Sequence, residues 1–311
     1  MSEAPVAVVT GGGRGIGRAA AVALGATGHR VCVNDPGADL DGSGTDPAPA
    51  EAVAEEIRAA GGDAMVSPVD ARTRSGAEDV VKAAEVWAGR PPTVLVHAAG
   101  VLRDRMLHKA SDDDWSEVLG VHLHVAIELT RAVAAPIRAG RWGRVVYVGG
   151  AAGLVGSVGQ ASYDVAKAGL FGLTRAVALE MAGRDVCVNY VAPFAFTRMT
   201  ESIPPATDQL RRYKDWAVAA RADDVGRLIG WLCSQDAAGI SGQVFGARGA
   251  EVSIWSQPRP AQRLFETAGW DARALSARAR PAFEPYLTPL ESEFDLFGDA
   301  PVAVVRDATS A

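Results

Sequence analysis

The chain has 311 residues, is 48% hydrophobic and carries a formal net charge of -6 at pH 7. This length allows one large or two small domains, and the apolar content is sufficient for a sizeable core. The acidic balance gives no electrostatic case for binding nucleic acid or an anionic membrane, so we expect neither as a partner.

The cysteines and the amino-terminal segment favour a cytoplasmic protein. Cys32, Cys187 and Cys233 are odd in number and widely spaced, and each lies in an apolar run. This pattern indicates buried, reduced thiols and argues against a disulfide framework or a metal site. The chain enters an apolar strand-like run almost at once, without the basic segment of a secretory leader.

Strand-length apolar segments alternate with longer amphipathic segments over most of the chain. The expected strands are 4–10, 30–35, 63–69, 93–98, 144–148, 185–191 and a short one at 243–246. The expected helices are 15–26, 50–60, 72–87, 112–139, 160–181, 204–219 and 222–234. We expect the long helix to be perturbed near Pro136.

Strands that are apolar on both faces and separated by helices indicate a parallel sheet that is covered on both sides. The sequence therefore predicts a single α/β domain of the Rossmann type, with a doubly wound sheet, over residues 1–250. The remaining residues, 251–311, show little periodicity. We expect them to form a C-terminal extension along the core or a neighbouring subunit rather than a second domain.

A glycine-rich segment, TGGGRGIG at 10–17, directly follows the first strand and opens the first helix. Glycine lets the backbone turn tightly and approach a pyrophosphate, whose charge then meets the free N–H groups of the helix. The alternative is a purely structural turn. The strand–turn–helix context favours a dinucleotide site. The predicted binding residues in this segment are Gly11, Arg14, Gly15, Ile16 and Gly17.

Two acidic residues at strand ends bear on which cofactor is bound. Asp35 ends the second strand, where a carboxylate can accept hydrogen bonds from both ribose hydroxyls and would repel a 2′-phosphate. This favours NAD over NADP, although Arg14 would argue for NADP unless it contacts the pyrophosphate or solvent. Asp70 follows the third strand, where it can accept a hydrogen bond from the adenine amino group or cap the next helix.

In chain order, the glycine loop, HAAG at 97–100 and the pair Tyr163 and Lys167 resemble the short-chain dehydrogenase/reductase family. The chain looks most like the dehydrogenase part of peroxisomal multifunctional enzymes of type 2 and like bacterial 3-hydroxyacyl-CoA dehydrogenases. The resembling segments include VNDPG at 33–37, GVLRDRMLHKASDDDW at 100–115 and GSVGQASYDVAKAGLFGLT at 156–174. The resemblance covers 4–250.

The resemblance implies further cofactor contacts and an assembly. The additional contact residues would be Ala98, Ala99, Gly100, Lys167, Pro193 and Thr197. The helix at 112–139 and the helix that carries Tyr163 would form a subunit interface, so a homodimer or homotetramer is expected.

The resemblance also implies hydride transfer at the nicotinamide C4, with Tyr163 as the acid/base for the substrate oxygen. Lys167 lies one helical turn further on the same face. Its ammonium is expected to lower the pKa of the phenol and to hold the nicotinamide ribose. His122 occupies the place of an Asn that completes a proton relay in many relatives, and it is either a relay or a core residue.

One departure from the family pattern concerns the substrate oxygen. The serine that usually stands thirteen residues before the tyrosine is Gly150 here, preceded by Gly149. Ser157 is the nearest candidate replacement. The loss of one positioned hydrogen bond to developing charge typically costs about 2–4 kcal/mol, or about a hundred- to a thousandfold in rate.

Three hypotheses follow from these patterns. The first is an NAD-dependent oxidoreductase that interconverts a secondary alcohol and a ketone, on a 3-hydroxyacyl-CoA-like, polyketide-like or steroid-like substrate. The second is a catalytically impaired subunit that works in a hetero-oligomer. The third is a non-redox cyclase, dehydratase or isomerase that reuses Tyr163.

Overall fold

The computed structural model describes residues 4–302 except 205, 268 and 298. Within this part of the chain, eight strands form one sheet: β1 (Val6–Thr10), β2 (Arg30–Asn34), β3 (Asp63–Ser67), β4 (Val94–His97), β5 (Trp142–Val148), β6 (Asp185–Phe194), β7 (Val244–Arg248) and β8 (Glu251–Ile254). The strand order is β3-β2-β1-β4-β5-β6-β7-β8. The first seven strands are parallel, and β8 pairs antiparallel with β7.

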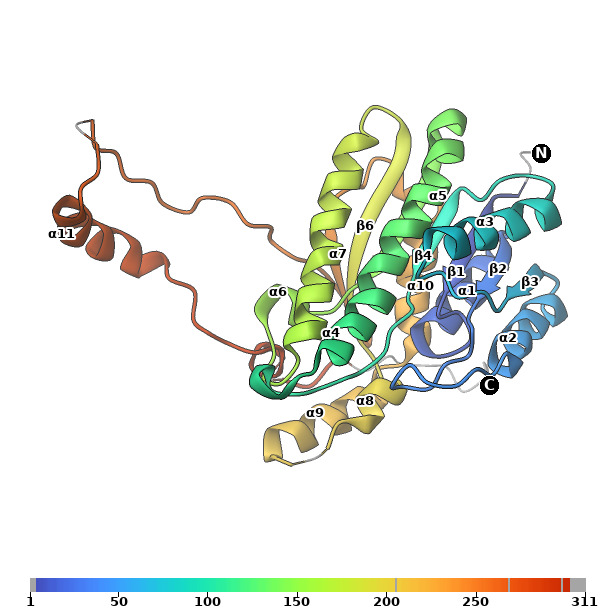
Figure 1. Ribbon diagram of the computed structural model, residues 1–311, viewed down its shortest axis with the longest axis horizontal. Coiled ribbons are helices and arrows are strands. Elements are labelled where there is room, and N and C mark those ends of the chain that lie inside the picture. Colours follow the sequence, from blue (N-terminus) through green and yellow to red (C-terminus); the bar gives the residue numbers. More distant parts are fainter. Residues whose placement is uncertain (1–3, 205, 268, 298, 303–311) are drawn as a thin grey trace.

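Helices cover both faces of the sheet (Figure 1). They are α1 (Gly15–Ala26), α2 (Ala48–Ala59), α3 (Arg74–Ala88), α4 (Asp112–Leu119), α5 (Val125–Gly140), α6 (Ala152–Val155), α7 (Ala161–Glu180), α8 (Arg198–Ser202), α9 (Asp208–Ala219), α10 (Ala222–Leu232), α11 (Ala272–Phe283) and α12 (Glu293–Leu296). This arrangement confirms the predicted doubly wound α/β fold.

Two hydrophobic layers sandwich the sheet because successive side chains of a strand point to opposite faces. In β1, Ala7 and Val9 pack into a cluster with α1, α2 and α10. Val6 and Val8 pack into a second cluster with α3, α5 and α7. All five residues of β1 are buried, which explains why this segment reads as a continuous apolar run.

The long helical stretch is interrupted at a different place from the one predicted. A π-helical turn, Gly120–His124, separates α4 from α5. The prediction of a perturbation near Pro136 was wrong, since α5 continues through Pro136 to Gly140. Pro136 leaves the carbonyl of Ala132 without its helical donor, but both residues are half-exposed, so water can hydrogen-bond that carbonyl.

By length and composition alone, the stretch Asp112–Gly140 is apolar enough to cross a membrane. In this fold its apolar side packs against α3, α7 and the sheet. The stretch is therefore accounted for as a core helix of the α/β sandwich.

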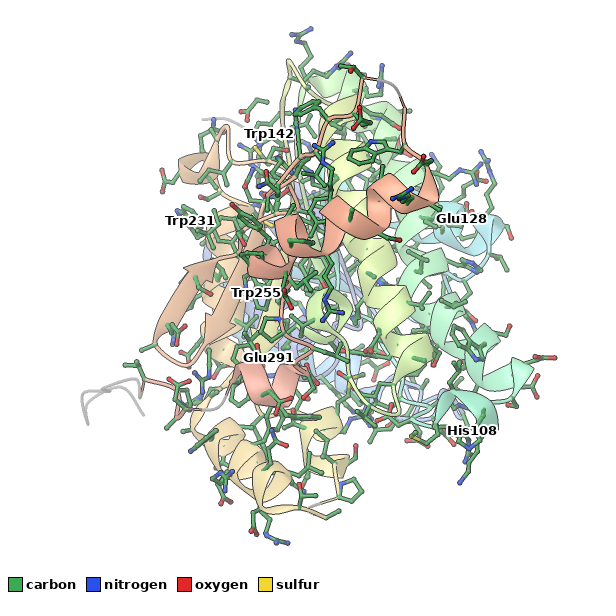
Figure 2. All side chains as sticks on the ribbon, turned by 90° about the vertical axis from the view of Figure 1, so that its left-hand side faces the viewer. His108, Glu128, Trp142, Trp231, Trp255 and Glu291 are labelled. Atoms are coloured by element: carbon green, nitrogen blue, oxygen red, sulfur yellow. The ribbon has the colours of Figure 1, made fainter. Side chains whose placement is uncertain are left out.

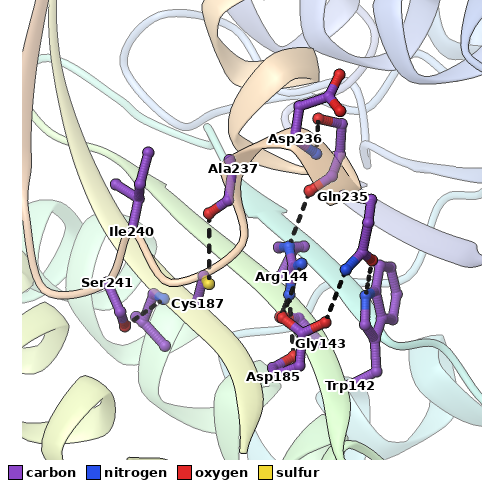
Figure 3. A network of polar contacts seen from close by, with 12 residues as sticks. Trp142, Gly143, Arg144, Asp185, Cys187, Gln235, Asp236, Ala237, Ile240 and Ser241 are labelled. Atoms are coloured by element: carbon purple, nitrogen blue, oxygen red, sulfur yellow. Dashed lines mark hydrogen bonds and ion pairs between the residues drawn. The ribbon is translucent and has the colours of Figure 1, made fainter.

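A polar network fixes the amino ends of β5 and β6 (Figure 3). Arg144 is fully buried in the middle of an apolar strand, which the sequence did not suggest. Its guanidinium forms an ion pair with Asp185 at 2.9 Å and donates hydrogen bonds to the carbonyls of Ser234 and Asp185. Gln235 links Trp142 to the Asp185 carboxylate. Cys32, Cys187 and Cys233 are buried and free, as predicted.

The C-terminal part is more structured than the sequence indicated. Strand β8 extends the sheet, after which the chain leaves the body and carries α11 on an arm (Figure 1). The chain then returns, and α12 packs beside α9. Figure 2 views the molecule from the side of this arm and labels Glu291 just before α12. The domain boundary at residue 250 remains a prediction.

Candidate functional site

A cleft of about 280 Å³ opens at the carboxyl ends of β1, β2, β4, β5 and β6. It includes the point between β1 and β4 where the strand order reverses, which is the usual ligand site of such sheets. Every residue predicted to bind the cofactor or to act in catalysis lines it: Gly11, Arg14, Gly15, Ile16, Gly17, Asp35, Asp70, Ala98, Ala99, Gly100, His122, Tyr163, Lys167, Pro193 and Thr197. The structure brings these residues together, while their individual roles remain predictions.

The backbone of the glycine loop packs so closely against neighbouring backbone that side chains have no room there. A Cβ at Gly17 would lie 2.0 Å from the carbonyl oxygen of Gly11, and a Cβ at Gly11 would lie 2.7 Å from Ala99 Cα. Gly11 also has a positive φ of 62°. Helix α1 starts after Arg14 without a side-chain cap. Its first N–H groups therefore face the cleft with no protein side chain bonded to them, which suits a pyrophosphate.

Asp35 is held at the end of β2 by two backbone donors. Its two carboxylate oxygens accept hydrogen bonds from the N–H groups of Gly13, at 2.9 Å, and Gly37, at 2.8 Å. These bonds fix the orientation of the carboxylate toward the cleft. Arg14 forms an ion pair with Asp46 at 3.6 Å.

Asp70 is an exposed residue beside the cleft. It forms an ion pair with Arg72, and it accepts a hydrogen bond from the Arg72 backbone N–H. The alternative in which it caps the following helix is wrong, because Thr73 is the N-cap of α3 and accepts from the N–H of Gly76.

Tyr163 and Lys167 lie on the inner face of α7. The Lys167 ammonium donates a hydrogen bond to the carbonyl of Val148 at 2.8 Å and lies 5.3 Å from the centre of the Tyr163 ring. Burial lowers the pKa of Lys167 to about 7. The pKa of Tyr163 is raised well above 10, first by burial and then by the carboxyl of Glu293. The pKa of this phenol is therefore raised rather than lowered, and the effect of Lys167 on it remains a prediction.

His122 projects from the π-helical turn against Tyr163. Its ring meets that of Tyr163 edge-on at 5.1 Å. Its Nε2 lies 3.0 Å from the N–H and 2.9 Å from the carbonyl of Val101, so it is anchored in either tautomer. Burial lowers the pKa of His122 well below 6.5, which keeps the imidazole neutral at physiological pH. The ring packs in the core and also borders the cleft.

The Gly149–Gly150 segment is shaped around a buried tyrosine of β6. The Tyr190 hydroxyl accepts from the N–H of Gly150 at 2.8 Å and donates to its carbonyl at 2.7 Å. A Cβ at Gly149 would lie 1.8 Å from the Tyr190 ring, so only glycine fits there. A Cβ at Gly150 would point at the Tyr163 hydroxyl from 3.3 Å, which is where a serine would act.

Ser157 was considered as a replacement for the serine that is missing at position 150. It is absent from the cleft lining. Its backbone N–H donates to Asp164 at 2.7 Å, and its hydroxyl is buried away from the cleft without a hydrogen-bond partner among the described residues. Ser157 is therefore not placed to replace the serine.

The sequence analysis missed Glu293, which lines the cleft together with Tyr213. A signal for α12 was present: Ser292 and Asp295 form a capping box, a Ser-x-x-Asp pattern that precedes an apolar pair. That pattern predicts a helix start. It carries no information on where the helix docks.

Comparisons with known proteins agree with this geometry. A family model for short chain dehydrogenases matches residues 5–208. Hydroxyacyl-CoA dehydrogenase ChsB1 of Mycobacterium tuberculosis is 36% identical over 292 residues, which cover 89% of this chain and 88% of that protein. Peroxisomal multifunctional enzyme type 2 of Mus musculus is 36% identical over 230 residues, which cover 74% of this chain and 30% of that protein.

A solved structure extends the likeness to three dimensions. A short chain dehydrogenase from Mycobacterium avium superimposes with a TM-score of 0.79 at 34% sequence identity, covering 93% of this chain and 97% of that one. The fold, the residues that line the cleft and the sequence relatives thus all indicate the same family. The chain belongs to the short-chain dehydrogenase family and is an oxidoreductase.

Proposed function

We propose that this protein is an NAD(H)-dependent oxidoreductase that interconverts a secondary alcohol and a ketone on a 3-hydroxyacyl-CoA-like substrate. The observation that carries the proposal is the convergence of the uncapped glycine loop, Asp35 and the pair Tyr163 and Lys167 on one cleft. A polyketide-like or steroid-like substrate is the alternative within the same reaction class. We further propose a cytoplasmic homodimer or homotetramer.

The residues present fit a dinucleotide. The close approach of the glycine backbone leaves room for the pyrophosphate, and Asp35 is oriented to accept from ribose hydroxyls. Arg14 and Arg198 both line the cleft and lie close enough to influence each other, and either guanidinium could meet a phosphate of the cofactor. Lys167 is placed to hydrogen-bond the second ribose. When bound, the nicotinamide would supply or accept a hydride at its C4.

The protein's own acid/base would be Tyr163. Since its pKa lies well above 10, its hydroxyl is protonated at neutral pH and can donate to the oxygen of a ketone as that oxygen becomes an alkoxide. Lys167 adds positive charge behind the phenol when protonated, which favours transfer of the phenolic proton. His122 packs against the ring and limits its rotation.

The substrate class rests on two supports. The cited relatives include a hydroxyacyl-CoA dehydrogenase. In addition, Tyr213 lines the cleft and its ring packs against Phe194 and Phe294 behind it, which gives this wall an aromatic face that suits an apolar acyl chain.

The proposal is tested by titrating the protein with NADH and NADPH while following cofactor fluorescence, and then by assaying NADH-dependent reduction of acetoacetyl-CoA. We expect saturable binding with preference for NADH, and turnover. A protein that does not bind either cofactor at concentrations of about 1 mM, which corresponds to only about -4 kcal/mol, would contradict the proposal.

Replacing Asp35 with asparagine is expected to lower the preference for NADH over NADPH by at least about tenfold, a difference of about 1.4 kcal/mol. The substitution removes the negative charge that repels a 2′-phosphate and keeps the side-chain shape. The ratio of the two dissociation constants is the measurement. Asp41→Asn, in the same loop and not part of the cleft lining, is the matched control and should leave the ratio unchanged. An unchanged ratio in Asp35→Asn would assign cofactor choice to other residues.

A further inference from the structure

The last described helix is fixed against the substrate side of the cleft by several independent contacts. The Phe294 ring meets Tyr213 edge-on at 4.8 Å, and Phe297 packs on Phe194 at 5.7 Å. Asp295 accepts a hydrogen bond from the Gln209 amide at 2.9 Å. These contacts join α12 to α9 and to the end of β6. Residues more than a hundred positions after the catalytic tyrosine are thereby held beside it.

Glu293 is the first residue of α12 and the residue of that helix that lines the cleft. Its backbone N–H donates to the carbonyl of Gly156 at 3.2 Å, which places the residue beside the segment that follows Gly150, and the backbone of Ala152 is near enough to the carboxyl to influence its pKa. The carboxyl therefore lies against the segment that immediately follows Gly150. It lines the same cleft as Gly150 and Tyr163 and is close enough to Tyr163 to raise the pKa of that phenol.

The surroundings favour a neutral carboxyl. Burial raises the pKa of Glu293 to about 7, and the negative charges of Asp164 and Asp104 add to the effect. The interaction with the backbone of Ala152 only partly offsets it. Carboxyls kept protonated by an apolar, acidic environment serve as hydrogen-bond donors in other active sites. A protonated Glu293 carries an O–H donor, as would the serine that is absent at position 150.

We propose that Glu293 is a catalytic residue whose carboxylic acid donates a hydrogen bond to the reacting oxygen of the substrate, in place of the serine absent at position 150. This inference rests on the proposed function. No proton leaves Glu293 in this step: the proton that neutralises the substrate oxygen comes from Tyr163. Glu293 stabilises the charge that develops on that oxygen before the proton arrives.

The test is a set of four variants assayed with NADH and acetoacetyl-CoA. Glu293→Ala removes the donor and should lower kcat by about a hundredfold or more, with the dissociation constant of NADH unchanged. Glu293→Gln retains an N–H donor of similar reach and should keep kcat within about tenfold of the original protein. Glu291→Ala removes the neighbouring exposed carboxyl and should have no effect.

The decisive variant restores the missing hydroxyl. Residue 150 has no positive φ, so a serine can adopt its backbone conformation, and its Cβ would face the Tyr163 hydroxyl from 3.3 Å. Gly150→Ser combined with Glu293→Ala should regain at least about tenfold of the lost kcat, equivalent to about 1.4 kcal/mol. A loss caused only by loosening of α12 would not be rescued by a side chain on a different segment.

The pH profile separates Glu293 from the other groups that titrate nearby. As pH rises through about 7 the Glu293 carboxyl ionises and can no longer donate, so kcat for reduction should fall. Lys167, Asp164 and Asp104 also face the cleft or Glu293, and they remain in every variant. The part of the fall that disappears in Glu293→Gln is the contribution of Glu293.

The outcomes distinguish this inference from the function on which it rests. If the unaltered protein binds NADH and turns over the thioester but Glu293→Ala retains its kcat, or Gly150→Ser gives no rescue, the role of Glu293 is refuted and the proposed function stands. If the unaltered protein neither binds NADH nor reduces the thioester, the proposed function and this inference fail together.

Discussion

Replacement of Tyr163 by phenylalanine is expected to lower kcat for NADH-dependent reduction of acetoacetyl-CoA by about 10²–10⁴-fold, the usual contribution of a positioned general acid. The variant loses only the hydroxyl that would protonate the substrate oxygen. The ring contact with His122 at 5.1 Å should persist. The pKa of Tyr163 lies well above 10, so the phenol remains protonated throughout the neutral range and can donate its proton.

Steady-state kinetics with a parallel NADH titration checks this result. The dissociation constant of NADH should be unchanged, because the phenol is assigned to the substrate rather than to the nucleotide. Tyr286→Phe, a tyrosine on the exposed arm, is the matched control and should behave as the original protein. Equal kcat values for Tyr163→Phe and the original protein would remove Tyr163 from the mechanism and favour a non-redox or non-catalytic use of the fold.

Substitution of Gly149 by alanine is expected to be severely destabilising. The new Cβ would lie 1.8 Å from the Tyr190 ring and 2.2 Å from its hydroxyl oxygen, and neither group has space to withdraw because Tyr190 is completely buried. Overpacking of this kind costs about 1–3 kcal/mol and sometimes more, and here it would also break the two hydrogen bonds between Tyr190 and Gly150. Thermal unfolding followed by circular dichroism is the measurement.

The control for this variant is Gly172→Ala in α7. Gly172 is exposed, and a Cβ there would meet no atom within 4 Å. Alanine is favoured over glycine in a helix by about 1 kcal/mol, so this variant should be as stable as the original protein or slightly more stable. A Gly149→Ala protein with an unchanged melting temperature would show that the Tyr190 contact is not as rigid as the structure indicates.

The α/β core could be predicted because its signals are local. Strands such as Val6–Thr10 are apolar throughout, and α1 was predicted at Gly15–Ala26 with both bounds correct. The glycine loop was equally readable, since its function depends on consecutive residues. Arg144 shows the limit of such signals: a charged residue in a strand gives no indication that carbonyls of two distant segments will satisfy it.

The site could be predicted only where its residues belong to local sequence motifs. Tyr163, Lys167 and Asp35 belong to motifs with fixed spacing, and topology places them together. Glu293 could not be found in this way, because its position depends on the docking of Phe294 and Phe297 after a long excursion of the chain. The raised pKa of Tyr163 was not predicted either, because it arises first from burial of the phenol and then from Glu293, and the motif indicates neither.

The position of α12 near the end of the chain determines the order in which parts of the site can form during synthesis. The glycine loop, the sheet and Tyr163 can all assemble on the ribosome as soon as β8 has emerged, and domains generally fold as units during synthesis. The wall that holds Phe294 and Glu293 is made only after α11 has been translated. A chain that ends between β8 and α12 would therefore keep the glycine loop, Asp35 and Tyr163 but lose Glu293 from the wall of the cleft.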